Sequence, residues 1–211
     1  VPGALVDFLV VSGGTQHDQT FAENFNEAYV NTGSAAALKP MPFSERKIIG
    51  RRVLREIAPG TIVNLGIGVP EAVASVAAET GRLGEFTLTL ESGPFGGVPA
   101  GGLSFGCSAH PEAVIEQPSQ FDFYDGGGLD VTVLGALEVD AEGCVNVTSP
   151  GGGRFAGVGG FVNISQSARR VIFACPFRAD GLTVTSRDGA LQITRDGTKA
   201  KFVRRVAQVC F

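Results

Sequence analysis

Glu91 has the surroundings expected of a reactive carboxylate. It follows the apolar run Phe86–Leu90 and precedes a glycine-rich stretch from Ser92 to Gly102. No lysine or arginine lies within eight positions on either side. Such a carboxylate is either paired with a distant cation across the fold or left poorly solvated, and poor solvation is what a nucleophilic carboxylate needs. The ordinary interpretation of a glutamate at a strand end is a capped or ion-paired surface carboxylate, and the flanking glycines weaken that interpretation here.

A second chemical feature is the segment 66–70, which lies between a predicted strand and a predicted helix. Backbone N–H groups at such a junction can bind a phosphate or a developing oxyanion. The segment lacks the third glycine of the dinucleotide-binding fingerprint, so a nicotinamide site is disfavoured. We regard these residues as candidate ligand contacts: Gly66, Ile67, Gly68, Val69 and Pro70.

Two further glycine runs occur at Asp125–Gly128 and at 151–161, where the second includes Gly159 and Gly160. Bare backbone can approach a ligand closely and present N–H donors to it. The alternatives are a plain turn between two strands for the first run and an ordinary surface loop for the second. Several glycine loops at strand ends suggest one shared crevice.

The elements that must position these loops alternate between strands and helices. Apolar spacing and terminal residues predict helices over 44–58 and 70–80. Short apolar runs predict strands at 61–65, 86–90, 130–136, 144–147 and 170–174. This order is typical of an α/β fold, so we predict an open, mostly parallel sheet flanked by helices as a three-layer sandwich.

The two ends of the chain differ in pattern from its centre. Residues 1–12 have the pattern of a strand, and 32–42 that of a linker, which favours one domain over 43–211. Near the carboxyl end, alternating segments at 182–185, 191–194 and 201–209 surround Asp188-Gly189 and Asp196-Gly197, which are hairpin turn signals. We predict an antiparallel β extension there.

Composition limits the class of protein. Hydrophobic residues make up 44% and charged residues 18%, with a net charge of −4, which argues for a folded domain and against a nucleic-acid partner. No apolar run is long enough to span a membrane. The four cysteines are far apart, which favours a reduced, cytoplasmic protein. The two histidines, His17 and His110, lack companions at metal-ligand spacing, so no metal is expected.

Taken together in order, four motifs resemble the family I coenzyme A transferases, with most similarity to the single-chain members that act on acetate, propionate and other short-chain acids. The resemblance covers nearly the whole chain. The motifs are Asn64-Leu65-Gly66-Ile67-Gly68-Val69-Pro70, Glu91-Ser92-Gly93 with Gly96-Gly97-Val98-Pro99-Ala100-Gly101-Gly102, Gln120-Phe121-Asp122-Phe123-Tyr124-Asp125-Gly126-Gly127, and Gly159-Gly160-Phe161-Val162-Asn163-Ile164-Ser165-Gln166.

The resemblance implies a role for each motif. Glu91 would attack the acyl-CoA thioester in ping-pong chemistry through a glutamyl-CoA thioester, with coenzyme A (CoA) as substrate and no metal or redox cofactor. Residues 66–70 would contact CoA. The loops of the oxyanion and acyl site would contain Gly96, Gly97, Gly159 and Gly160.

The resemblance also implies partners for this chain. Residues 1–42 would be the tail and linker of a preceding amino-terminal domain, which contributes to CoA binding, and the domain over 43–211 would be truncated at its carboxyl end. Homo-oligomers are expected. Two other functions stay open, an acyl-CoA hydrolase on the same scaffold and a non-catalytic sensor of a CoA ester or sugar phosphate. A serine hydrolase is discounted because Ser92 lacks the GxSxG elbow.

Overall fold

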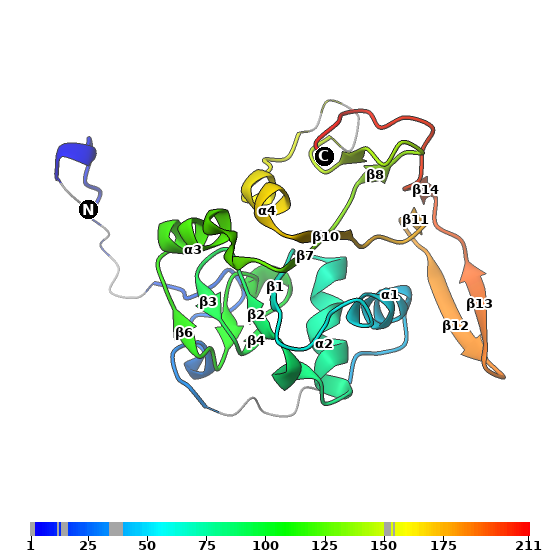
Figure 1. Ribbon diagram of the computed structural model, residues 1–211, viewed down its shortest axis with the longest axis horizontal. Helices are drawn as coiled ribbons and strands as arrows, with labels where there is room; N and C mark the ends of the chain where they lie inside the picture. Colours follow the sequence, from blue (N-terminus) through cyan, green and yellow to red (C-terminus); the bar gives the residue numbers. More distant parts are fainter. Residues whose placement is uncertain (1–2, 12, 14–16, 34–39, 150–152, 154) are drawn as a thin grey trace.

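A six-stranded sheet forms the centre of the computed structural model, which describes residues 3–11, 13, 17–33, 40–149, 153 and 155–211 (Figure 1). Its strand order is β10-β7-β1-β2-β3-β6. The first four strands in that order are mutually parallel, whereas β3 is antiparallel to both of its neighbours. The bounds are β1 Ile62–Leu65, β2 Thr87–Thr89, β3 Pro94–Phe95, β6 Ala113–Val114, β7 Val131–Leu134 and β10 Arg170–Phe173.

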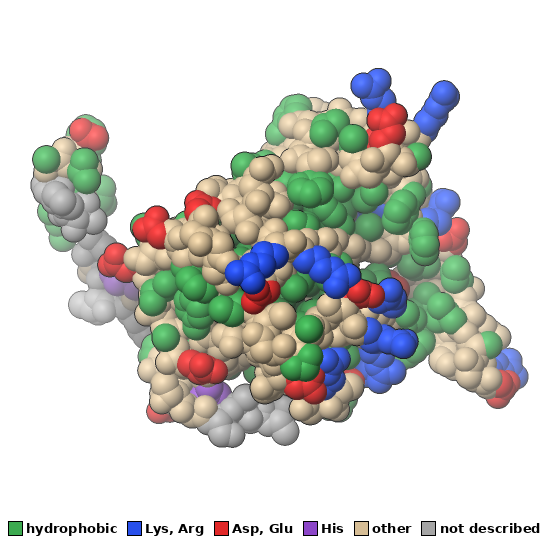
Figure 2. Space-filling view, in the orientation of Figure 1, with side chains coloured by type: hydrophobic (Ala, Val, Ile, Leu, Met, Phe, Trp, Pro, Cys, Tyr) green, Lys and Arg blue, Asp and Glu red, His purple; other side chains and the backbone are tan. Residues whose placement is uncertain are grey.

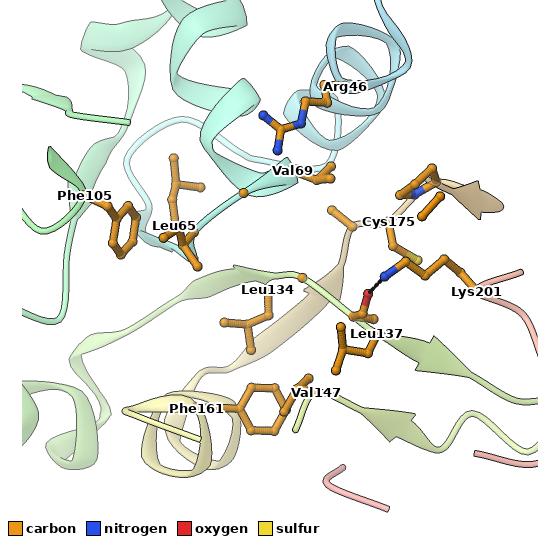
Figure 3. A pocket seen from close by; sticks show the side chains of 18 of the residues that line it. Arg46, Leu65, Val69, Phe105, Leu134, Leu137, Val147, Phe161, Cys175 and Lys201 are labelled. Carbon is orange, nitrogen blue, oxygen red and sulfur yellow. Dashed lines mark hydrogen bonds between the residues drawn. The ribbon is translucent and has the colours of Figure 1, made fainter. Parts of the chain in front are cut away.

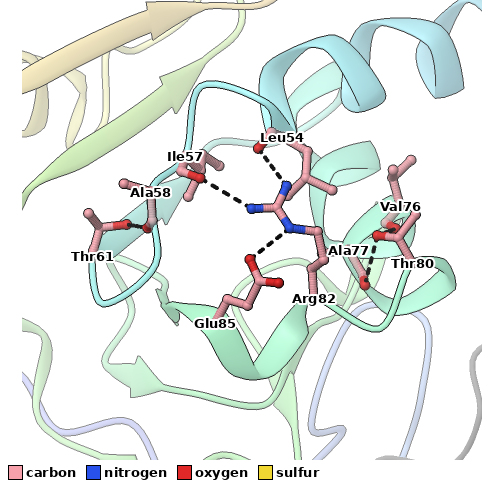
Figure 4. Close-up of polar contacts among 9 residues, drawn as sticks. All are labelled: Leu54, Ile57, Ala58, Thr61, Val76, Ala77, Thr80, Arg82 and Glu85. Atoms are coloured by element: carbon pink, nitrogen blue, oxygen red, sulfur yellow. Dashed lines mark hydrogen bonds and ion pairs between the residues drawn. The ribbon is translucent and has the colours of Figure 1, made fainter.

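Helices α1, Glu45–Leu54, and α2, Ala72–Glu79, cover one face of the sheet. The Ser44 side chain caps the start of α1 by accepting a hydrogen bond from the Lys47 backbone. Helix α1 ends at Leu54, earlier than the predicted Ala58. Arg82 donates to the carbonyl of Leu54, the last residue of the helix, and to that of Ile57 just beyond it, and forms an ion pair with Glu85 (Figure 4).

Helices α3, Gln117–Phe123, and α4, Phe161–Ser167, cover the opposite face, where Tyr124 and Leu129 are completely buried. Helix α3 continues as a π-helical turn, Tyr124–Gly128, so the turn between two strands considered for 125–128 is wrong. Short 3₁₀ helices occur at Gly3–Leu5, Glu27–Tyr29, Val69–Glu71, Leu83–Glu85 and Gly102–Ser104. The predicted α/β fold with helices on both faces of a mostly parallel sheet is confirmed.

Small antiparallel pairs surround the main sheet, and the predicted antiparallel extension is confirmed. The hairpin of β12 and β13 projects away from the sheet, and Figure 2 shows hydrophobic side chains on it. All six residues of β13 are exposed. The pairs are β4 Val98–Pro99 with β5 Ser108–Ala109, β8 Glu138–Val139 with β9 Val145–Asn146, β11 Arg178–Ala179 with β14 Lys199–Ala200, and β12 Thr183–Arg187 with β13 Ala190–Arg195.

Two strand predictions are wrong, at 201–209 and at 1–12, and the strand predicted at 144–147 forms outside the main sheet. Residues 201–209 form bends after β14, with a single β-bridge between Phe202 and Val139. Further along, backbone N–H groups of Val206 and Ala207 bond to side chains of Asp140 and Glu138 and not to a neighbouring strand. Strand β9 joins β8 and not the main sheet. Residues 3–11 form no strand, and residues 4–11 are exposed. Some of the predicted residues lie outside the described part of the chain. They are 1–2 and 12 in the first segment, 34–39 in the linker, and 151, 152 and 154 in the run at 151–161.

The strand order places a topological switch point beside β1. The chain builds β1, β2 and β3 towards one edge and then returns to the other side of β1 with β7. Ligands of open α/β sheets bind in the crevice outside the carboxyl ends of the strands at such a point. Separately, the described part of the chain contains no helix that is both long and apolar enough to cross a membrane.

Candidate active site

A cleft of about 560 Å³ opens at the carboxyl ends of β1, β2, β7 and β10. Its wall is largely apolar, and Figure 3 shows Leu65 and Phe105 on one side with Leu134, Phe161 and Val147 on another. Polar and charged lining residues are few, which is usual for a cleft that binds a small organic ligand. They include Arg46, Asn64, Glu91, Arg178, Asp180 and Lys201.

Glu91 lines this cleft from the turn that follows β2, two residues beyond the end of the strand. Burial raises the pKa of the Glu91 carboxyl, and a hydrogen bond from the Gly160 backbone opposes that rise. No lysine or arginine in the described part of the chain forms an ion pair with it. The carboxylate is therefore partly desolvated without a cationic partner, which leaves its oxygens available for bond formation.

Gly159 and Gly160 bring bare backbone against that carboxylate, just before α4. A Cβ atom at Gly160 would lie 2.3 Å from Glu91 Oε2 and 2.6 Å from Phe121 Cζ. A Cβ atom at Gly159, where φ is +55°, would lie 4.0 Å from Glu91 Oε1. Glycine at 160 is thus required by close approach to the carboxylate.

The segment 66–70 reaches the same cleft from β1. Gly66, Ile67, Gly68 and Val69 line it, whereas Pro70 is buried beneath the turn. The Gly66 N–H bonds to Val133 O at 2.8 Å and the Gly68 N–H bonds to Glu71 Oε1 at 2.7 Å. Those two donors are occupied by the protein, so the segment contributes shape and exposed side-chain surface to the cleft.

The other two predicted glycines, Gly96 and Gly97, lie outside the cleft. The Gly96 N–H bonds to Leu88 O at 2.7 Å, which places this glycine beside the middle of β2, three residues before Glu91. A Cβ atom at Gly97 would lie 2.3 Å from Ala109 O. Neither glycine lines the cleft. The structure therefore brings Gly159 and Gly160 to Glu91 but not these two.

Sequence reasoning missed the basic residues of the cleft. Lys201, from the turn after β14, donates from Nζ to Ala136 O at 2.9 Å, and burial lowers the pKa of its ammonium (Figure 3). Arg46, on α1, lines the opposite side. No local pattern marks either residue, because they meet the cleft through tertiary contacts far from Glu91 in sequence.

Comparison with known proteins places the chain in a family, although no protein-family model matches it. It is 42% identical over 224 residues to caffeate CoA-transferase of Acetobacterium woodii and 35% identical over 218 residues to acetate CoA-transferase YdiF of Escherichia coli K12. Both matches cover 100% of this chain, which spans 41% and 40% of those relatives.

A shorter relative and a solved structure agree with these matches. Acetate CoA-transferase subunit beta of Escherichia coli K12 is 34% identical over 162 residues, covering 70% of this chain and 68% of the relative. The crystal structure of the acyl-CoA transferase YdiF from Escherichia coli O157:H7 superposes with a TM-score of 0.73 at 37% identity, over 83% of this chain and 33% of that one. With the fold, the cleft and Glu91 at its edge, these matches show that the chain belongs to the family I coenzyme A transferases.

Proposed function

We propose that this chain supplies the nucleophile of an enzyme that transfers CoA from an acyl-CoA to a free carboxylic acid. The observation that carries the proposal is Glu91, a partly desolvated carboxylate at the cleft, close to the Gly160 backbone and with no cationic partner among the described residues. Burial raises the pKa of this carboxyl, and a more basic carboxylate is a better nucleophile towards a thioester.

The reaction balances with Glu91 as the covalent carrier. A Glu91 oxygen attacks the thioester carbonyl, the carbon–sulfur bond breaks, and CoA thiolate leaves an acyl-glutamyl anhydride. The thiolate then attacks Cδ of Glu91 and expels the acyl group as its carboxylate, which leaves a glutamyl-CoA thioester. The acceptor carboxylate repeats both steps in reverse, and Glu91 is regenerated. No step needs an external oxidant or a net proton, and we propose no metal or redox cofactor.

The cleft is proposed to accommodate CoA along 66–70, with the acyl group near Gly159 and Gly160. Short-chain acids such as acetate, propionate, butyrate or a 3-oxo acid are the proposed substrates. Two relatives are named for acetate and one for caffeate, so the apolar wall formed by Leu134, Val147 and Phe161 is the feature to vary when acids are compared.

The proposal also includes partners. An amino-terminal half, on the same or a separate chain, would complete CoA binding. The shorter relative is named as a subunit, which supports a partner chain. The exposed apolar segment from Leu5 to Val11 is the surface we assign to that contact. Assembly into homo-oligomers in the cytoplasm completes the proposal.

Chemical trapping tests the nucleophile. The complete protein is incubated with acetyl-CoA, treated with borohydride and mapped by mass spectrometry, with Glu91→Gln as the matched control. Reduction of Glu91 to the corresponding alcohol is expected in the wild type and not in the variant. Absence of the modification from a protein that consumes acetyl-CoA would sink the proposal. Turnover that needs no acceptor acid would instead identify a hydrolase, and binding without turnover a sensor.

A further inference from the structure

One aromatic side chain on the wall of the cleft lies outside the hydrophobic core. Phe105 lines the cleft on the same side as Leu65 and is only partly buried (Figure 3). Leu65 belongs to the hydrophobic cluster on one face of the sheet, and Leu134 and Phe161 belong to the cluster on the other face, whereas Phe105 belongs to neither. Packing of the core therefore fixes the other three side chains, and a different set of contacts must hold Phe105 in place.

A hydrogen bond joins the loop of Phe105 to the turn of Glu91. The Ser92 side chain donates to the carbonyl of Gly106, and a Cβ atom at Gly106 would lie 3.6 Å from Ser92 Oγ. Ser92 directly follows Glu91, and Gly106 directly follows Phe105. Glu91 and Phe105 thus line one cleft from two loops that are in contact. The part of the wall that Phe105 forms therefore encloses the same space as the Glu91 carboxylate.

Glu23 anchors that loop from a segment far away in the sequence. The buried Ser104 hydroxyl, directly before Phe105, donates to Glu23 Oε2 at 2.8 Å and lies 3.0 Å from Thr20 Oγ1. Thr20 Oγ1 also accepts from the Glu23 backbone N–H at 2.9 Å. A hydrogen bond to a carboxylate is stronger than one between two neutral groups. The segment around Glu23 therefore fixes the backbone position from which Phe105 projects.

Glu23 itself is held by the short helix that ends at Tyr29. Asn26 Nδ2 donates to Glu23 Oε1 at 3.0 Å, and the Tyr29 hydroxyl donates to Glu23 Oε2 at 2.5 Å. The hydrogen bond from Tyr29 is the largest cause of the lowered pKa of Glu23, so this carboxyl is charged at neutral pH. A cavity of about 100 Å³ is lined by Tyr29 together with Ser92 and Gly106. The helix that holds Glu23 therefore lies against both loops.

We propose that Phe105 is a specificity-determining residue for the acyl group and that Glu23 is its positioning residue, acting through Ser104. This inference rests on the proposed function. In the anhydride the acyl group is bonded to a Glu91 oxygen, and a ring that is held rigidly in the cleft limits the length of chain that fits. Rejection by a clash is one of the two ways in which a site discriminates between ligands. Loss of the anchor lets the ring move aside, so a longer chain is accommodated with no gain for a short one.

Phe105→Ala in the complete protein tests the specificity role. Transfer to propionate is measured from acetyl-CoA and from hexanoyl-CoA, and the readout is the ratio of the two kcat/KM values. We expect the ratio to shift towards hexanoyl-CoA by about tenfold or more, since one methylene in an apolar pocket is worth about tenfold. The ratio does not depend on the fraction of enzyme that is folded, so a merely structural role would leave it unchanged. Phe105→Leu replaces this variant if it fails to fold.

Ser104→Ala and Tyr29→Phe form a matched pair for the positioning role. Each removes one hydroxyl that donates to Glu23 Oε2, but only Ser104 belongs to the loop of Phe105. We expect Ser104→Ala to shift the ratio towards hexanoyl-CoA by about fivefold, the effect of one hydrogen bond on an equilibrium, and Tyr29→Phe to leave it within about twofold. Both variants should lower the melting temperature. Equal ratios in the two variants would overturn the positioning role of Glu23.

Borohydride labelling separates a failure of this inference from a failure of the proposed function. A wild type labelled at Glu91, together with a wild-type ratio in Phe105→Ala and in Phe105→Leu, would overturn the specificity role and leave the proposed function standing. No label in a wild type that consumes acetyl-CoA would overturn the proposed function and this inference with it.

Discussion

Two glycine pairs that look alike in sequence have different tasks in the fold. Gly159-Gly160 lies at the cleft, where the space of a Cβ at Gly160 is occupied by the Glu91 carboxylate and the Phe121 ring. Gly96-Gly97 lies in the turn between β3 and β4, where both residues have a φ near +70° and the space of a Cβ at Gly97 is occupied by the carbonyl of Ala109. Gly160 leaves space for the side chain of Glu91, whereas Gly97 leaves space for a backbone carbonyl.

The difference teaches how to read a glycine run. Gly160 has φ −76°, a value open to any residue, so its backbone conformation does not explain its identity. Gly97 has a left-handed conformation that favours glycine by itself. Substitution at Gly160 should therefore affect catalysis, and substitution at Gly97 should affect folding.

Gly160→Ala is expected to give the largest effect. The added methyl group must displace the Glu91 carboxylate or the Phe121 ring, and a misplacement of about 1 Å in an active site costs about 100-fold in rate. We expect kcat in the complete protein to fall by about that factor while circular dichroism stays that of the wild type. Gly157→Ala is the control, since it also lines the cleft and a Cβ there meets nothing within 4 Å. Equal kcat values for Gly160→Ala and Gly157→Ala would contradict the catalytic role assigned to the close approach at Gly160.

Gly97→Ala should instead lower the free energy of unfolding by about 3 kcal/mol, from left-handed strain and overpacking together. Urea denaturation measures this change, and kcat per folded molecule should stay within about twofold of the wild type. Gly143→Ala separates the two causes, because Gly143 also has positive φ but open space around its Cβ position. Its loss should be about 1 kcal/mol. If Gly97→Ala lowered kcat without lowering the free energy of unfolding, Gly97 would have a catalytic role and not the structural one assigned here.

The smallest expected effect is on the pH dependence of stability, through the Glu91 carboxyl beside Gly160. Burial raises the pKa of Glu91 above its ordinary value of 4.5, so the folded protein holds this proton more tightly than the unfolded chain does. The resulting stability is fully present below pH 4.5 and is lost as the pH rises through the folded pKa. Glu91→Gln removes this dependence. Urea midpoints from pH 4 to 7 should show the wild type falling relative to the variant, and parallel curves would contradict the assigned burial.

The sequence was most informative where local pattern and burial coincide. Strands β1 and β7 were predicted because their residues are mostly apolar, and almost all of them are buried in the sheet. The apolar run of β10 was predicted in the same way, although this edge strand is only partly buried. Glu91 stood out for the same reason, as a charge at the end of such a run. The strand expected over 201–209 failed because alternation alone cannot show that side chains of Asp140 and Glu138 capture the backbone N–H groups.

The remainder of the site depends on contacts distant in sequence. No local pattern marks Phe105, because its loop is held by the side chain of a residue in a distant segment. Lys201 follows β14 and reaches the cleft through its hydrogen bond to the carbonyl of Ala136, a residue far away in the sequence. The structure also separates Gly96 from Gly159, and composition alone does not distinguish a turn between two strands from a loop at the cleft.

The exposed hairpin of β12 and β13 has a consequence for how the molecule opens. A two-stranded ribbon is marginally stable by itself, and every residue of β13 is exposed. Its amide protons should therefore exchange with solvent through local opening, while those of β1 and β7 exchange only when the whole sheet unfolds. Hydrogen exchange should thus resolve two cooperative units in the described part of this chain, the hairpin and the main sheet.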